Sequence, residues 1–356
     1  MYTLGIDIGS TTVKVAVLND EHKILFSDYK RHFANIKETL KELVEEAKDS
    51  LSDFEVSPCI TGSGGLALAQ LIGVPFTQEV VCVSEALQDY APQTDVAIEL
   101  GGEDAKIIYF TNGIEQRMNG VCAGGTGSFI DQMATLLQTD AKGLNDYAKD
   151  YDTIYPIAAR CGVFAKTDIQ PLINEGATKP NLAASIFQAV VNQTISGLAC
   201  GKPIKGNVAF LGGPLHFLPE LKNAFIRTLN LTGDAIIDPG HSHLFAAVGA
   251  ALNSKPEITM TLSDLIHALS QELNLSSGVE RLAPLFESDE DYEKFKADHN
   301  KYAVKRGDLA TYKGNCFIGV DAGSTTTKVA LVGSNGELLY DFYSSNNGSP
   351  LNTTIR

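Results

Sequence analysis

Apolar residues recur with two different periods along the chain, and together they predict a mixed α/β fold. Short apolar runs bounded by Gly, Asn or Asp are typical of strands, whereas apolar residues three or four positions apart are typical of amphipathic helices. Strands are expected at residues 4–8, 13–18, 24–29, 58–61, 95–100, 105–110 and 208–211, and helices at residues 36–51, 64–71, 126–137, 182–199 and 243–252. We therefore assign residues 1–252 to one α/β domain.

The N-terminal pattern occurs a second time near the end of the chain. Residues 5–17 read GIDIGSTTVKVAV, and residues 319–331 read GVDAGSTTTKVAL. Such self-similarity indicates a repeated structural unit, so we expect residues 316–356 to be the truncated start of a second, homologous domain. Residues 317–343 should form a strand meander without a nucleotide. Residues 253–315 are predicted to be a mostly helical connector, with a small third domain as the alternative.

Composition narrows the classes of function. Hydrophobic residues make up 44% of the chain, which is ordinary for a globular protein, and there is no run of about 18 apolar residues to predict a membrane span. The N-terminus lacks the basic region and the long apolar stretch of a secretory signal, so a cytoplasmic location is expected. The formal net charge of -15 repels nucleic acids and anionic membranes, and we expect neither as a partner.

A glycine turn after the first predicted strand suits the binding of a phosphate group. Residues 7–14 read DIGSTTVK, and a glycine in such a turn lets backbone amides approach an anion closely. Hydroxyl groups would add further donors to the phosphate oxygens. The predicted nucleotide ligands are Gly9, Ser10, Thr11, Thr12 and Lys14, and Asp7 suits a Mg²⁺ ion bound mainly through water. Taken alone, the segment could equally be an ordinary hairpin with a polar turn.

Two further glycine turns follow later in the chain. Residues 99–106 read ELGGEDAK, and carboxylates beside a phosphate make sense with a metal ion or as groups that position water, because bare anions repel. From this turn we predict Gly101, Gly102 and Lys106 as nucleotide ligands, and Glu103 and Asp104 as catalytic residues together with Asp7. The third turn, LGGP at residues 211–214, would let Gly212, Gly213 and Pro214 approach a flat base or a ribose.

The order of these turns is more specific than any one of them. Strand–DIGSTTVK–strand, strand–GG–strand and strand–GGP–helix resemble the two phosphate motifs and the adenosine motif of the actin, sugar kinase and heat-shock chaperone superfamily. The resemblance implies an actin-like α/β fold, with two ribonuclease-H-like lobes and ATP in the cleft between them. The predicted helix 243–252 is rich in Ala and Gly, and it would lie where the lobes meet, because close helix crossing needs small side chains.

Two cysteines lie in segments that each precede a predicted helix. Cys122 lies in MNGVCAGGTGSF (residues 118–129) and Cys161 in ARCGVFAKTD (residues 159–168). Near a helix N-terminus the backbone amides favour a thiolate, and an anionic iron–sulfur cluster fits the same setting. Two cysteines cannot complete a four-thiolate site, whereas a two-fold dimer presents the pair twice. Their spacing alone does not establish a cluster, because isolated cysteines are more often core residues.

Together, the segments MNGVCAGGTGSF, ELGGEDAK, ARCGVFAKTD and LGGPL resemble the activator ATPases of 2-hydroxyacyl-CoA dehydratases and the related ATP-binding subunits of benzoyl-CoA reductases, the BadF/BadG/BcrA/BcrD type of ATPase. The resemblance implies one [4Fe-4S] cluster at a homodimer interface, held by Cys122 and Cys161 of each subunit. It also implies ATP with Mg²⁺, a ferredoxin or flavodoxin as electron source, and a CoA-ester dehydratase or reductase as partner, which in long members can belong to the same polypeptide. We count Gly125, Thr126 and Gly127 among the nucleotide ligands.

One position departs from the family pattern, and two other functions use the same fold. Many single-domain activators have Gln where this chain has Glu103, and a carboxylate only accepts hydrogen bonds, so the rate of hydrolysis would differ. A sugar or small-acid kinase would need a catalytic aspartate, for which Asp104 and Asp131 are the candidates. A non-redox, nucleotide-dependent regulator would bind ATP without iron. Iron content separates the activator from both alternatives.

Overall fold

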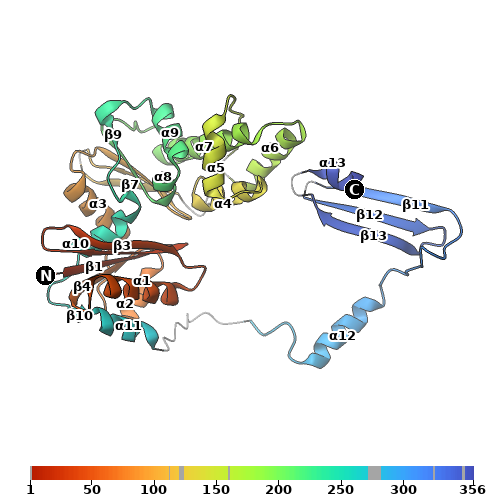
Figure 1. Cartoon of the computed structure of the whole chain (residues 1–356), viewed down its shortest axis with the longest axis horizontal. Helices are drawn as coiled ribbons and strands as arrows, with labels where there is room; N and C mark the ends of the chain where they lie inside the picture. The colour runs from red at the N-terminus through yellow and green to blue at the C-terminus, as the bar shows by residue number, and fades with distance from the viewer. Residues whose placement is uncertain are drawn as a thin grey trace. The chain divides into compact units, whose positions relative to one another are not determined.

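A computed structural model describes residues 2–111, 113–119, 124–158, 161–271, 282–323, 325–346 and 349–356. Cys122 lies outside the described residues. Two compact units divide the chain, the first comprising Met1–Leu172 and Gly176–Asn274, and the second containing Leu275–Arg356. The first unit consists of two lobes, each built on a five-stranded sheet (Figure 1).

The first lobe is a mixed sheet covered by three helices. Its strand order is β10-β4-β1-β2-β3, and β1 pairs antiparallel with β2 and parallel with β4. The strands are β1 (Tyr2–Ile8), β2 (Thr12–Leu18), β3 (Ile24–Arg31), β4 (Glu55–Thr61) and β10 (Met260–Thr261), and the helices are α1 (Ile36–Leu51), α2 (Gly65–Ile72) and α11 (Leu262–Ser270). One apolar core joins this sheet to α1 and α11. Residues 260–270, assigned to the connector from the sequence, thus contribute a strand and a helix to this lobe.

The second lobe repeats this architecture with the strand order β7-β6-β5-β8-β9. Its strands are β5 (Val96–Leu100), β6 (Ala105–Tyr109), β7 (Glu115–Met118), β8 (Val208–Leu211) and β9 (Ile236–Ile237), and its helices are α4 (Gly127–Leu136), α5 (Ala141–Tyr147), α6 (Gly162–Asn174), α7 (Lys179–Thr194), α8 (Gly213–Phe217) and α9 (Pro219–Leu229). Helix α7 begins three residues earlier than predicted, because the side chain of Thr178 caps it by accepting a hydrogen bond from the Asn181 amide.

Helix α7 continues into a π-helix at Ile195–Ala199, and the two together span Lys179–Ala199. This helix is long and apolar enough to cross a membrane. Two thirds of its most apolar window (67%) is buried inside the lobe. A core helix meets the same criteria as a membrane span, so burial in the lobe accounts for its apolar composition.

The chain crosses between the lobes through two helices, α3 (Glu79–Tyr90) and α10 (Phe245–Leu252) (Figure 1). They pack so closely that a Cβ atom on Gly249 of α10 would lie 1.8 Å from the carbonyl oxygen of Cys82 in α3. Apolar residues of α3, α10 and both sheets form a common core around this crossing. The Ala- and Gly-rich helix therefore lies between the lobes, two residues shorter at its start than predicted.

The second unit contains the repeated motif. Strands β11 (Cys316–Ala322), β12 (Thr326–Gly333) and β13 (Leu338–Ser345) form an antiparallel meander, as predicted, and helices α12 (Asp289–Asn300) and α13 (Pro350–Ile355) flank it in sequence. Lys328 forms an ion pair with Asp321 at 2.8 Å.

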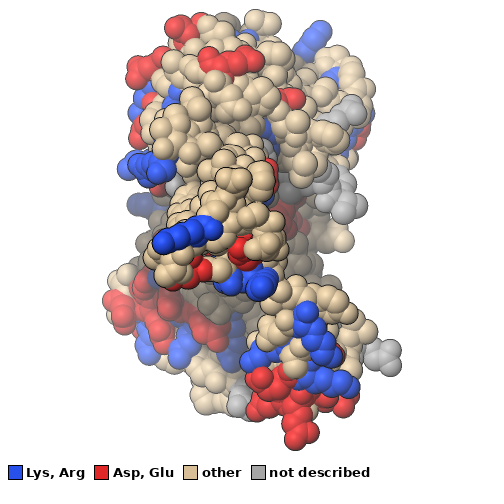
Figure 2. Space-filling view, turned by 90° about the vertical axis from the view of Figure 1, so that its right-hand side faces the viewer, with Lys and Arg blue, Asp and Glu red and all other residues tan. Residues whose placement is uncertain are grey.

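On the face of the molecule shown in Figure 2, basic side chains occur in small groups among acidic ones, without a continuous basic surface.

Candidate nucleotide-binding site

The three glycine turns converge on one cleft in the first unit. The cleft has a volume of about 890 Å³, including the space open to solvent, and residues of both lobes line it. The first two turns lie close together: a Cβ atom added to Gly102 would be only 2.3 Å from Oγ1 of Thr11. The third turn meets the second at Gly212, which has a φ of +89° and leaves no room for a Cβ atom beside the carbonyl of Leu100. The geometry thus brings together backbone groups from three separate segments.

Asp7 and Lys14 face each other at the first turn, on the paired strands β1 and β2. Lys14 Nζ donates a hydrogen bond of 2.5 Å to Asp7 Oδ2. Burial alone would lower the pKa of Lys14, but the charge of Asp7 and this hydrogen bond outweigh it, so the pKa lies above its usual value. Asp7 is 1% exposed, and its other oxygen, Oδ1, has no hydrogen-bond partner among the described residues.

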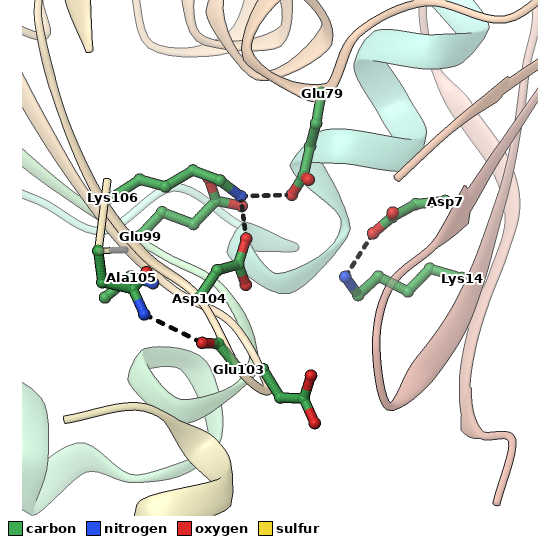
Figure 3. A network of polar contacts seen from close by, with 9 residues as sticks. Asp7, Lys14, Glu79, Glu99, Glu103, Asp104, Ala105 and Lys106 are labelled. Atoms are coloured by element: carbon green, nitrogen blue, oxygen red, sulfur yellow. Dashed lines mark hydrogen bonds and ion pairs between the residues drawn. The ribbon is translucent and has the colours of Figure 1, made fainter. Parts of the chain in front are cut away.

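A second charged group, centred on Lys106, lies across the cleft (Figure 3). Lys106 is 4% exposed, and its Nζ lies 2.8 Å from Glu79, 2.6 Å from Asp104 and 3.7 Å from Glu99. Burial opposes the charge of Lys106, but these carboxylates raise its pKa well above the usual value. Burial also raises the pKa of Glu99, and it raises that of Glu79 to about 7 against the attraction of Lys106.

The charge of the cleft fits a nucleotide bound with Mg²⁺. Among the described residues, five carboxylates line it, and Lys14 and Arg31 are the lining cations. A triphosphate would add negative charge to this acidic setting, so a divalent cation is needed to offset the repulsion. Asp7 Oδ1 and Glu99 Oε2 are buried oxygens without a hydrogen bond in the described structure, and they suit such an ion. The described residues contain no group of three or more His, Cys, Asp or Glu side chains that could hold a metal ion by themselves.

Aromatic rings line the cleft beside Lys14, whose Nζ lies 6.0 Å from the centroid of the Tyr29 ring. Tyr29 and Phe217 both line the cleft, with ring centroids 5.5 Å apart. His243 packs against both rings and stacks on His216 at 3.9 Å. Burial lowers the pKa of His243 to about 3, so its ring is neutral at pH 7. A neutral, aromatic wall beside the third glycine turn suits a nucleotide base.

The structure places most of the predicted residues in this cleft. The predicted residues that line it are Asp7, Gly9, Ser10, Thr11, Thr12, Lys14, Gly101, Gly102, Asp104, Gly127, Gly212, Gly213 and Pro214. Glu103 and Lys106 line a neighbouring cavity, and the carboxylate of Glu103 points away from Lys106 (Figure 3). Gly125 and Thr126 are not among the lining residues; Thr126 is buried directly before α4.

Among the lining residues that were not predicted from the sequence are Tyr29, Arg31 and Glu79. Tyr29 and Arg31 come from β3, which runs beside the strand of the first turn, and Glu79 is the first residue of α3. None lies in a glycine turn or in another motif, so the sequence contains no local signal for them.

Cys161 lies outside the cleft lining, directly before α6. It is half-buried, and its carbonyl oxygen accepts a hydrogen bond of 3.0 Å from the Ala165 amide. The next turn exposes two large apolar side chains, Val163 at 72% and Phe164 at 65%. Cys161 therefore lies beside an exposed apolar surface at a helix start.

Two lobes of this topology with a nucleotide cleft between them define an actin-like ATPase fold. The chain belongs to the BadF/BadG/BcrA/BcrD ATPase family, whose model matches residues 4–254. It is 27% identical over 269 residues to the 2-hydroxyisocaproyl-CoA dehydratase activator of Clostridioides difficile, covering 71% of this chain and 94% of the relative. It is 29% identical over 218 residues to the (R)-2-hydroxyglutaryl-CoA dehydratase activating ATPase of Acidaminococcus fermentans, covering 60% and 83%.

Solved structures show the same fold. Component A of the (R)-2-hydroxyglutaryl-CoA dehydratase of Acidaminococcus fermentans superposes with a TM-score of 0.63 at 27% identity, covering 71% of this chain and 97% of that one. The activator of the 2-hydroxyisocaproyl-CoA dehydratase from Clostridium difficile with bound ADPNP has a TM-score of 0.62 at 24% identity, covering 80% and 100%. The actin-like fold predicted from the order of the glycine turns is confirmed.

Proposed function

We propose that this protein is an ATP-dependent one-electron donor that activates a 2-hydroxyacyl-CoA dehydratase or a related CoA-ester reductase. The relatives named as dehydratase activators support this class of partner, and a subunit of the benzoyl-CoA reductase of Thauera aromatica, 24% identical, also matches. The observation that carries the proposal is Cys161, a half-buried cysteine at the start of α6, beside the exposed Val163 and Phe164.

The surroundings of Cys161 suit a [4Fe-4S] cluster shared between two copies of the chain. A helix start suits an anionic cluster, and an exposed apolar surface gains stability when a second subunit covers it. Cys161 and Cys122 of both subunits would hold the cluster, which supplies a one-electron redox centre when bound. The protein would work in the cytoplasm, and a reduced ferredoxin or flavodoxin would provide the electron.

Binding and hydrolysis of ATP would then control the transfer. ATP with Mg²⁺ would lie between the glycine turns, with Lys14 and Lys106 offsetting the phosphate charge. Because both lobes line the cleft, a bound nucleotide would change the position of α4 and the other second-lobe helices relative to the first lobe. The electron would pass to the dehydratase or reductase component, which can be part of the same full-length polypeptide.

Iron analysis of anaerobically purified protein tests the proposal. We expect about four iron atoms and four acid-labile sulfides per dimer, with ATP turnover. Cys161→Ser should lose the iron and keep its fold and nucleotide binding. Cys200→Ser is the matched control, because Cys200 is an exposed free cysteine of the same lobe, and it should keep the iron. Colourless wild-type protein after anaerobic reconstitution would contradict the electron-transfer role and leave the ATPase intact.

A further inference from the structure

An ion pair connects the two lobes across the nucleotide cleft. Arg31 is the last residue of β3 in the first lobe, and Asp131 lies in α4 of the second lobe. Arg31 Nη1 donates a hydrogen bond of 2.8 Å to Asp131 Oδ2, and both residues line the cleft. Their side chains are 49% and 37% exposed. Water and salt weaken an ion pair this exposed, so a competing anion can break it.

Arg31 lies beside the first phosphate turn. In the pairing of β2 with β3, Arg31 is opposite Thr12, and the next residue, His32, donates its amide to the carbonyl of Thr11 at 3.2 Å. Cross-strand partners place their side chains on the same face of a sheet, so the guanidinium and the Thr12 hydroxyl share one wall of the cleft. A guanidinium binds phosphate oxygens with two parallel hydrogen bonds.

Arg31 is also the cation best able to change partner. Lys14 is 14% exposed and held by Asp7, while Lys106 is 4% exposed and surrounded by three carboxylates. Moving either lysine would leave buried carboxylates without their counter-charge, which is costly. Releasing Asp131 costs little, because water reaches it.

Helix α4 is hydrogen-bonded at its N-terminus to the second phosphate turn. The amides of Gly127 and Ser128 donate to the carbonyls of Gly101 and Gly102, at 3.0 and 2.7 Å. Asp131 follows one helical turn later. The first lobe therefore holds α4 through Arg31, whereas the second lobe holds it through its own phosphate turn.

We propose that Arg31 is a phosphate ligand that exchanges Asp131 for the phosphate chain of ATP, so that nucleotide binding releases α4 from the first lobe. The exchange rests on nucleotide binding in this cleft, and it deepens the proposed function by naming the contact through which ATP reaches α4. This helix begins five residues after Cys122 in the sequence. Asp131 thus competes with ATP for Arg31.

The affinity of the full chain for Mg²⁺-ADPNP, measured by calorimetry, tests the exchange. Arg31→Gln should raise the Kd about tenfold, since it removes a charge-assisted hydrogen bond to phosphate. Asp131→Asn should lower the Kd about two- to fivefold, because it removes the competitor. Asp146→Asn is the matched control: it breaks an exposed ion pair with Lys149 and removes the same charge away from the cleft lining, and it should leave the Kd unchanged.

A double mutant separates competition from a general effect of charge. If Asp131 acts through Arg31, the protein carrying both substitutions should have the Kd of Arg31→Gln alone. Two results would overturn the proposal. The first is weaker nucleotide binding by Asp131→Asn, which is expected if the ion pair stabilises the nucleotide-binding form of the cleft. The second is an Asp131→Asn substitution that lowers the Kd equally in the presence and absence of Arg31. These measurements need neither iron nor a partner protein. A Kd result that contradicts the exchange would therefore say nothing against the iron–sulfur cluster. Protein without iron would likewise say nothing against the exchange.

Discussion

At the scale of single residues, the cleft combines turn residues that the sequence predicts with side chains that only packing brings there. The ligands of the first turn are predictable because a glycine turn and its hydroxyl groups are contiguous in DIGSTTVK. Glu79 has no such context, and it reaches the cleft because α3 begins there. Lys106 was predicted as a phosphate ligand, but three carboxylates from separate positions surround it. Such clusters depend on tertiary contacts that no local pattern contains.

Glu79 is the cleft carboxylate best suited to accept a proton from the attacking water. It contacts Lys106 and lines the cleft, and burial raises its pKa to about 7. A carboxylate must be ionised to accept a proton, so kcat/KM for ATP hydrolysis should increase from about pH 6 to about pH 8 with a midpoint near 7. Glu79→Gln should lower kcat by about 10²–10⁴-fold, and it should abolish this rise. Steady-state ATPase assays across this pH range measure both effects.

Glu103→Gln provides the control, because Glu103 lies outside the cleft lining and its carboxylate points away from Lys106. We expect this variant to retain the rate and the pH profile of the wild type. An unchanged pH profile of kcat/KM in Glu79→Gln, or a large decrease of the ATPase rate in Glu103→Gln, would indicate that Glu103 positions the attacking water instead.

At the scale of elements, seven strands and five helices of the first unit are predicted from the sequence, whereas α3 is among the helices that are not. The apolar pattern predicts no element at residues 79–90, where Val80 to Val83 form a continuous apolar run with three β-branched valines. Such a run lacks helical spacing on its own. Packing of Cys82, Val83 and Ala86 against α10 makes the segment a helix, so the element depends on a partner more than 150 residues away in the sequence.

The crossing of α3 and α10 should tolerate no side chain at Gly249. A methyl group there would lie 1.8 Å from the carbonyl oxygen of Cys82, which is backbone and cannot move aside alone. Gly249→Ala should therefore lower the free energy of unfolding by about 3 kcal/mol, at the upper end of overpacking. Gly240→Ala is the control, since its added Cβ would meet nothing within 4 Å. Urea denaturation measures both, and equal stability of the two variants would contradict the close crossing.

At the scale of the whole molecule, the family match and the folded unit do not end at the same residue. The match covers residues 4–254, and the apolar pattern also places a boundary at residue 252. The core of the first lobe nevertheless includes α11, whose Leu262, Leu265 and Leu269 are fully buried. A short helix after a polar stretch has too few residues to indicate its partner, so its place in the core could not be predicted from the sequence.

Two truncations separate these boundaries. A chain ending at Asn274 keeps α11 and every residue of the cleft, so it should bind Mg²⁺-ADPNP with the affinity of the full chain. A chain ending at Ser254 loses three buried leucines, each contributing about 1.5–3 kcal/mol, and it should be less stable by roughly 5 kcal/mol or more. Thermal unfolding should show a clear decrease in Tm for the shorter chain only. Equal Tm values would mean that the lobe closes its core without α11, and weaker nucleotide binding by the longer chain would give the second unit a part in the cleft.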